Sequence, residues 1–145
     1  MTEVLRHAET DADIASCFQV MRLLRPHLAD AAELQARVRR QAAAGYRILA
    51  AWRGAEAVGL AGYRPQENLI RGPFRYVDDL VVRDDLRRSG LGARLLAAVA
   101  EDAQASGFPY LVLDTDLANA LGQRFYFRFG MLPAALRFAM PLTGV

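Results

Sequence analysis

The sequence predicts a mixed α+β fold, and three observations carry this prediction. Apolar residues make up 53% of the 145 residues and charged residues 23%, the composition of a globular chain long enough to bury a core. Stretches with the period of a strand and stretches with the period of a helix follow one another along the sequence. A basic turn with two glycines, residues 87–92, lies between one strand pattern and one helix pattern. We expect a single domain covering residues 1–145.

The expected strands are short stretches of alternating or continuous apolar residues. In order, they cover residues 3–8, 46–53, 56–64, 74–82, 110–114 and 136–142. Gly54 between the second and third strands predicts a hairpin, and residues 65–73 are expected to form a polar loop before the fourth. In the last stretch, large apolar side chains alternate with small or charged ones, which is typical of a half-buried strand near a sheet edge.

The expected helices have apolar residues at the spacing of one helix face. They cover about residues 11–24, 31–44, 91–106 and 119–129. Asp11 or Asp13 is the candidate N-cap of the first helix. Pro26 predicts a corner between the first helix and the second. Glycines are expected to end the later helices, at positions 45, 107 and 130.

The charge balance argues against a nucleic-acid binder. All eighteen basic residues are arginine, sixteen acidic residues offset them, and the formal net charge is +2. The arginines at positions 37, 39 and 40 are expected to form a mostly solvated face of the second helix. Nucleic acid is therefore not an expected partner. A membrane is not expected either, because no apolar run approaches the length of a bilayer span.

The cysteine and histidine content indicates the cellular compartment and argues against a metal cofactor. Cys17 is the only cysteine, so no internal disulfide can form, and we expect a cytoplasmic protein. The N-terminus lacks the apolar region of a signal peptide. The two histidines lie far apart in the sequence and have no metal-ligand spacing, so no metal site is expected.

The turn Arg87-Arg88-Ser89-Gly90-Leu91-Gly92 has the features of a phosphate site. Its glycines let the backbone approach a ligand closely. The first amides of the following helix have no partner inside the helix, and the helix dipole adds positive charge there. Leu95 stands where the dinucleotide fingerprint needs its third glycine, and no Walker sequence follows. The alternative is an ordinary loop-to-helix turn.

Two segments resemble the GNAT superfamily of acyl-CoA-dependent N-acyltransferases, in particular its small bacterial members. Residues 80–96 look like the family's pyrophosphate-binding segment, R/Q-x-x-G-x-G/A, which follows its fourth strand. Downstream, Asn119 and Tyr126 fit the spacing of a second family segment. Gly122 and Met131 replace the alanine and the phenylalanine that are usual in that segment. The resemblance covers almost the whole chain.

The resemblance implies a fold and a co-substrate. The fold would be a central, mostly antiparallel twisted sheet with a V-shaped opening between the fourth and fifth strands, flanked by about four helices. Acetyl-CoA would lie in that opening, with its pantetheine along the fourth strand and its pyrophosphate on the glycine turn. The residues expected to bind it are Leu80, Val81, Val82, Arg87, Arg88, Ser89, Gly90, Leu91, Gly92, Ala93, Asn119 and Tyr126.

The resemblance also implies direct attack of an amine on the thioester. Tyr126 is the candidate acid for the leaving thiolate, or else an aromatic packing residue. Asp79 or Asp78 is the candidate base, through a water, and the alternative is a carboxylate paired with an arginine. Because adjacent strand residues point to opposite faces, at most one of the two is expected in the acceptor site. His27 is the next candidate, and Asn119 either contacts pantetheine or caps its helix.

We therefore expect an N-acetyltransferase acting on a small cationic amine or on an amine of a peptide or protein. Four aspartates near the predicted opening favour a cationic acceptor: Asp78, Asp79, Asp114 and Asp116. The alternative is a non-catalytic acyl-CoA-binding sensor or interaction module on the same fold. We also expect a homodimer formed through residues 132–145, unless the apolar side chains of that segment only cover their own core.

Overall fold

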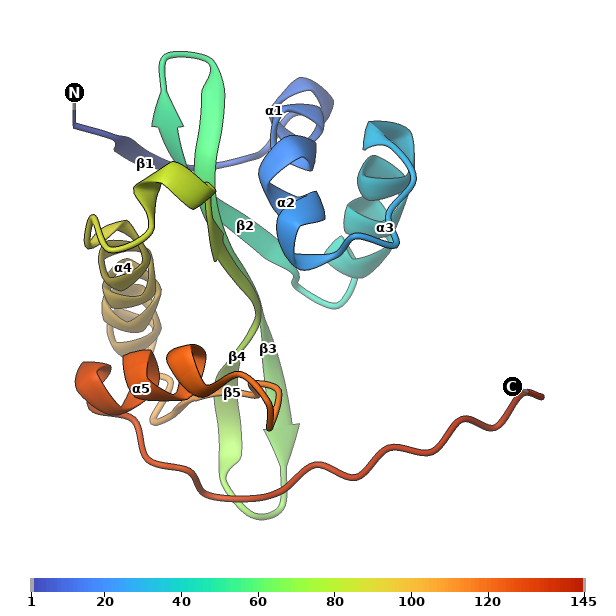
Figure 1. The fold of residues 1–145 in the computed structure, drawn as a ribbon. Coiled ribbons are helices and arrows are strands. Elements are labelled where there is room, and N and C mark those ends of the chain that lie inside the picture. Colours follow the sequence, from blue (N-terminus) through green and yellow to red (C-terminus); the bar gives the residue numbers. More distant parts are fainter. Residues whose placement is uncertain (1, 145) are drawn as a thin grey trace. The chain divides into compact units, whose positions relative to one another are not determined.

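The computed structural model describes residues 2–144, which fall into two compact units, one ending at Leu113 and one beginning at Asp114. The first unit contains one five-stranded sheet in the order β1-β2-β3-β4-β5 (Figure 1). The strands are β1 (Val4–His7), β2 (Arg47–Arg53), β3 (Glu56–Asn68), β4 (Gly72–Val82) and β5 (Leu111–Leu113). Each neighbouring pair is antiparallel except β4 and β5, which are parallel. The predicted mixed, mostly antiparallel sheet is confirmed.

The hairpin of β3 and β4 is longer than the sequence indicated. Residues 65–73 do not form a loop, because β3 continues to Asn68 and β4 begins at Gly72. The Asn68 carboxamide oxygen accepts the amides of Ile70 and Arg71, and this closes a short turn in place of the predicted loop. Strand β2 pairs with β3 only as far as Tyr63, so Pro65 lies where one edge of β3 is free, and proline is tolerated there.

Three helices cover one face of the sheet (Figure 1). They are α1 (Asp11–Ser16), α2 (Phe18–Leu24) and α3 (Ala31–Ala42). The single helix predicted over residues 11–24 is wrong, because the helix is interrupted at Cys17 and forms two shorter helices. The N-cap is Thr10 rather than either aspartate, and Asp13 completes a reciprocal capping box with it. The predicted corner is confirmed at residues 25–30.

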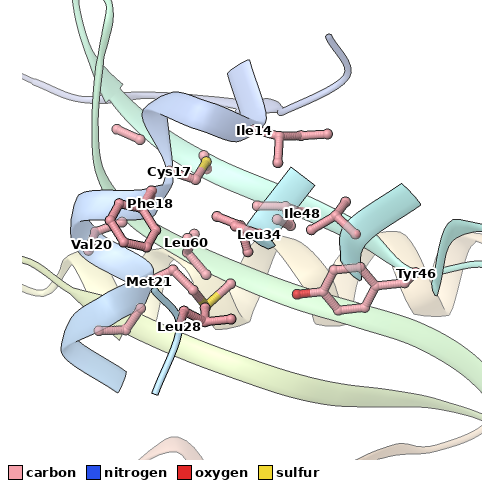
Figure 2. Close-up of a cluster of buried hydrophobic side chains, with 14 of the residues drawn as sticks. Ile14, Cys17, Phe18, Val20, Met21, Leu28, Leu34, Tyr46, Ile48 and Leu60 are labelled. Carbon is pink, nitrogen blue, oxygen red and sulfur yellow. The ribbon is translucent and has the colours of Figure 1, made fainter. Parts of the chain in front are cut away.

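These helices bury a continuous apolar cluster against the sheet. Figure 2 shows side chains of α1, α2 and α3 packed on Ile48 of β2 and Leu60 of β3. Cys17 lies inside this cluster and is fully buried, and burial raises the pKa of its thiol to about 12. The thiol is therefore a packing group rather than a nucleophile.

The other face of the sheet carries α4 (Leu91–Ala105), which follows the short 3-10 helix η1 (Asp84–Leu86) (Figure 1). The buried face of α4 consists of Leu91, Leu95, Leu96, Val99 and Ala103. At Gly59 an added Cβ would lie 3.2 Å from Leu95 and 3.1 Å from Val82, so helix and sheet approach closely there. This packing fixes where the N-terminus of α4 stands relative to the end of β4.

The second unit consists of α5 (Ala120–Phe129) and the segment that follows it. Gly130 ends the helix with a φ of +105°, as predicted. Residues 131–144 form neither helix nor strand, so the strand predicted over residues 136–142 is wrong. Alternation of apolar side chains suits a strand, but a strand also needs a hydrogen-bonded neighbour, and none of the described residues provides one. The large apolar side chains of this segment are exposed, at Leu132, Leu136, Phe138, Met140 and Leu142.

Candidate active site

A β-bulge in β4 shapes the centre of the candidate site. Gly62 of β3 pairs with Asp79 and Tyr63 pairs with Val77, so Asp78 has no partner residue across the ladder. A bulge inserts one residue and interrupts the alternation of side chains along the strand. The rule that adjacent residues point to opposite faces therefore does not hold here.

Contacts on either side of the bulge place both aspartates on the face of α1–α3. Arg75 binds Asp102 of α4, so the next residue, Tyr76, lies on the opposite face. The Arg64 guanidinium lies 5.9 Å from the Tyr76 ring centroid and binds Asp78 with an Nη2–Oδ1 distance of 3.0 Å. The alternation rule behind the expectation of at most one aspartate in the acceptor site thus fails at the bulge, although only Asp79 of the two lines the pocket described below.

Asp79 is buried and held from two directions. The Tyr46 hydroxyl donates to Oδ2 at 2.6 Å, and Arg25 Nε donates to Oδ1 at 2.9 Å. Arg25, the C-cap of α2, also donates from Nη2 to the Asp78 carbonyl at 2.7 Å. This hydrogen bond links the end of α2 to the bulge. Burial, reinforced by the Asp79 charge, raises the pKa of Tyr46 well above its ordinary value. Tyr46 is therefore a hydrogen-bond donor here and not a base.

Gly62 is part of the same arrangement. A Cβ at this position would lie 1.9 Å from the Tyr46 hydroxyl oxygen and 2.8 Å from Asp79 Oδ2. Only glycine leaves room for the Tyr46–Asp79 hydrogen bond across β3. Sequence reasoning missed Tyr46, Arg25 and Gly62, since none of them stands in a recognisable motif and they meet only when the strands pair.

Asp78 has a different environment. Its carboxylate is paired with Arg64, with an Nε–Oδ2 distance of 3.1 Å. Burial raises the pKa of Asp78, and the hydrogen bond and charge of Arg64 oppose that rise only in part. A carboxyl group with a raised pKa is a better proton acceptor than an ordinary aspartate.

A pocket opens between α2, α3 and the sheet, beside Asp79. Its volume is about 110 Å³. One wall is apolar and is formed by Met21, Leu28, Leu34 and Val38. The polar residues that line it are Arg25, His27, Arg37, Gln41, Tyr46 and Asp79. His27 thus lies at this pocket, whereas the segment 65–73 does not line it.

The structure revises the prediction of a solvated arginine face on α3. Arg39 is exposed and binds Asp11, while Arg40 is exposed with no side-chain partner among residues 2–144. Arg37, by contrast, lines the pocket and is held by Glu33, with an Nη2–Oε2 distance of 3.0 Å. Helical periodicity predicted the helix but did not show that α2 and α3 line a common pocket.

The turn at residues 87–92 presents free backbone donors. Gly90 is the N-cap of α4 with a φ of +87°, and Arg88 has a φ of +69°. Such values favour glycine and are uncommon for other residues. The Ser89 hydroxyl accepts the Leu91 amide. No residue in the described range 2–144 accepts the amides of Arg88, Gly90, Gly92 and Ala93.

The arginines near this turn divide into two groups. Arg83 is bound to Glu56 and Asp85, and Arg94 is bound to Glu3. Arg87 makes one exposed contact with Asp84 at 3.1 Å, and Arg88 has no ion pair with any described residue. Arg87 and Arg88 are therefore the cations most available to an anionic ligand at the turn.

The pairing of β4 with β5 is short. It covers only Arg75–Val77 on β4 and Leu111–Leu113 on β5. Beyond Val77, no strand among the described residues runs beside β4 on the β5 side. The edge that contains Leu80, Val81 and Val82 is thus unpaired, which is the opening expected between the fourth and fifth strands.

The second unit contains Asn119 and Tyr126. Asn119 caps α5, because its side-chain oxygen accepts the Gly122 amide at 3.0 Å. A Cβ on Gly122 would lie 2.3 Å from Asn119 Nδ2, which explains glycine at this position. Tyr126 is half-buried beside Phe125, with a ring-centroid distance of 5.2 Å, and burial raises the pKa of its hydroxyl.

The comparison with protein families identifies the class. Residues 7–131 match the acetyltransferase (GNAT) family. This match covers most of the chain, including the bulged strand, the glycine turn and α5. The protein belongs to the GNAT acetyltransferase family.

Two curated relatives are similar in sequence. They are the L-methionine sulfoximine/L-methionine sulfone acetyltransferases of Pseudomonas paraeruginosa and Pseudomonas aeruginosa. Each is 38% identical over 105 residues, which is 70% of this chain and 59% of the relative. The matched part of the chain thus spans about three-fifths of the length of these relatives.

Solved structures share the fold at low identity. An acetyltransferase of Trypanosoma brucei has a TM-score of 0.80 at 21% identity, covering 97% of this chain and 99% of its own. Glucosamine-6-phosphate N-acetyltransferase of Arabidopsis thaliana has a TM-score of 0.79 at 16% identity, covering 98% and 99%. These likenesses show the GNAT fold.

No helix of residues 2–144 has both the length and the apolar character needed to cross a bilayer. Within the same range, no three His, Cys, Asp or Glu side chains come together as a metal site would require.

Proposed function

We propose that this protein transfers the acetyl group of acetyl-CoA to the amine of a small molecule. The observation that carries the proposal is the set of free backbone amides at the start of α4, next to the unpaired edge of β4. In a member of this family, such a turn suits the pyrophosphate of CoA. The pocket beside Asp79 would receive the amine.

The CoA site follows from these elements. The free amides of Arg88, Gly90, Gly92 and Ala93 would bind the pyrophosphate, with the Ser89 hydroxyl ordering the turn. Arg87 and Arg88 would contact the phosphates, because Arg83 and Arg94 are already bound to carboxylates. Leu80, Val81 and Val82 would pair with the pantetheine as an added strand does.

The reaction begins when the neutral amine attacks the thioester carbon. A tetrahedral intermediate forms with negative charge on the former carbonyl oxygen, and a backbone amide of β4 would stabilise that charge. The nitrogen then loses a proton to the base, the carbon–sulfur bond breaks, and the thiolate takes a proton. The products are the N-acetylated amine and CoA.

The two aspartates would have different roles toward the amine: one would orient it and the other would accept its proton. Asp79 lines the pocket and is fixed by Tyr46 and Arg25, which suits it to orient the incoming ammonium group. Asp78 has the raised pKa, and Arg64 is its one side-chain partner among residues 2–144, which suits it to accept the proton through a water. His27 lines the same pocket and is the alternative acceptor of the proton.

Tyr126 would supply the proton to the thiolate. This assignment comes from its position in the family segment. It is supported by a hydroxyl that has no hydrogen-bond partner among the described residues and whose pKa is raised, so the group is protonated at neutral pH. Asn119 would act as the cap that fixes the start of the same helix.

The curated relatives act on derivatives of an amino acid. Together with the small volume of the pocket, this favours a small-molecule acceptor over a peptide or protein. The free thiol released from acetyl-CoA, measured over a panel of small amines, tests the proposal. If no amine releases thiol while calorimetry still detects CoA binding, the protein is a non-catalytic acyl-CoA-binding module.

A further inference from the structure

The charges that line the pocket do not match a purely cationic acceptor. Two arginines, Arg25 and Arg37, line it, against one carboxylate, Asp79. Arg37 also binds Glu33, which does not line the pocket. An acceptor bearing only positive charge would therefore meet more like charge than opposite charge.

Each of the two arginines uses two of its three guanidinium nitrogens in hydrogen bonds within the protein. Arg25 uses Nε on Asp79 and Nη2 on the Asp78 carbonyl. Arg37 uses Nε and Nη2, both on Glu33 Oε2. The Nη1 groups of both arginines have no partner among residues 2–144. Each guanidinium thus keeps donors without a partner among residues 2–144, and both arginines line the pocket.

Glu33 restrains the Arg37 side chain through an ion pair. Its other oxygen, Oε1, accepts the Ala29 amide at 2.7 Å in the segment between α2 and α3. That hydrogen bond, followed by the one from Arg37, lowers the pKa of Glu33, so the carboxylate is ionised at neutral pH. An arginine that is already ordered loses less conformational entropy when it binds a ligand.

We infer that the acceptor carries a carboxylate as well as its amine, and that Arg25 and Arg37 bind this carboxylate. This inference rests on the proposed acetyl transfer. The amine would lie at Asp79, and the carboxylate would accept from Nη1 of each arginine. The acceptor class is a free amino acid with a short side chain, which would pack on Met21, Leu34 and Val38.

The pocket volume agrees with that class. At about 110 Å³ it is well below the roughly 300–1,000 Å³ typical of sites for larger ligands. The expected preference for a purely cationic acceptor loses support, because three of the four aspartates that favoured it have arginine partners. Asp78 binds Arg64, Asp79 binds Arg25, and Asp114 binds Arg137.

Matched pairs of acceptors that differ only in the carboxylate test the inference. L-methionine, L-leucine and L-methionine sulfone are compared with 3-(methylthio)propylamine, 3-methylbutylamine and 3-(methylsulfonyl)propylamine. We expect kcat/KM for at least one amino acid to exceed that of its amine roughly 10- to 100-fold, the range for losing a charged hydrogen bond. Arg37→Gln should remove most of that difference by raising KM for the amino acid, with little change for the amine.

Arg40→Gln is the control, since Arg40 lies on the same helix, is exposed and does not line the pocket. It should leave both kinds of acceptor unchanged. Thermal unfolding and calorimetry with CoA show whether each variant is folded and binds the co-substrate. Equal kcat/KM within every pair, or an equal loss for both members in Arg37→Gln, overturns the carboxylate site while acetyl transfer stands. The carboxylate site is also overturned if the protein acetylates other small amines but accepts neither member of any of these pairs.

Discussion

At the scale of single residues, the centre of the site depends on a bulge that lets two consecutive aspartates share one face of the sheet. The Asp79 carboxylate is buried and accepts from Tyr46 and Arg25, whereas the Asp78 carboxylate is paired with Arg64 and has a raised pKa. The same residue type thus acquires two roles from two environments.

The pH dependence of the rate separates these roles. A base must be deprotonated, so activity falls as pH drops through the pKa of the base, and a raised pKa for Asp78 moves that fall to higher pH than an ordinary aspartate gives. Asp78→Asn should remove this acidic limb and lower kcat roughly 10²- to 10⁴-fold. Asp79→Asn should mainly raise KM for the amine and keep the limb. An unchanged pH profile in Asp78→Asn assigns the base to another residue, with His27 tested next.

Tyr126→Phe tests the proposed acid. The change removes the hydroxyl and keeps the ring that packs on Phe125. We expect kcat to fall roughly 10- to 10³-fold, because the thiolate loses its proton donor, while affinity for acetyl-CoA changes little. A rate equal to that of the parent protein, under conditions where chemistry limits turnover, makes Tyr126 a packing residue.

Gly62→Ala tests the close approach at Tyr46. The added Cβ would lie 1.9 Å from the Tyr46 hydroxyl oxygen, so either the strand or the ring has to move. We expect the free energy of unfolding to fall by about 1–3 kcal/mol, as for other overpacked sites, measured by urea denaturation. Gly144→Ala is the control, since nothing lies within 4 Å of the position of its Cβ. Equal stability of the two variants contradicts the packing described here.

At the scale of elements, the start of α4 is the feature that most directly concerns the co-substrate. It combines a left-handed Gly90 with backbone amides that no described residue accepts. The buried face of α4 packs on the sheet, so this arrangement is fixed before any ligand binds.

Gly90→Asp should abolish or greatly weaken CoA binding. The side chain would bring a negative charge to the site proposed for pyrophosphate, and any side chain is strained at a φ of +87°. Gly90→Ala is the matched control, since it has the strain without the charge and should bind CoA more tightly than the aspartate variant. Calorimetry on folded protein measures both, and parent-like affinity in Gly90→Asp contradicts the phosphate site.

At the scale of the whole molecule, the segment after α5 exposes several large apolar side chains. Leu136 is 67% exposed, Phe138 89% and Met140 76%. Exposed apolar groups gathered in one segment are typical of a surface that another molecule covers.

We predict that a second copy of the chain covers this segment in a homodimer. Light scattering at micromolar concentration should give a mass about twice the 16.0 kDa of the chain. Phe138→Ser should shift the mass toward that of the monomer by removing apolar contact area. A mass near 16.0 kDa across a dilution series of the parent protein contradicts the dimer.

Features that depend on neighbours along the chain could be predicted from the sequence. The periods of the first five strands, the corner at Pro26, the glycine turn before α4 and the glycine that ends α5 are local, and the structure has each of them. The tertiary structure alone decided the features that depend on partners from distant segments. It lengthened the β3–β4 hairpin, broke the first helix at Cys17 and left residues 136–142 without a strand neighbour. It also brought Arg25, Tyr46, Gly62 and Asp79 together, residues far apart in sequence that meet because β3 pairs with β4 at a bulge and α2 packs above it.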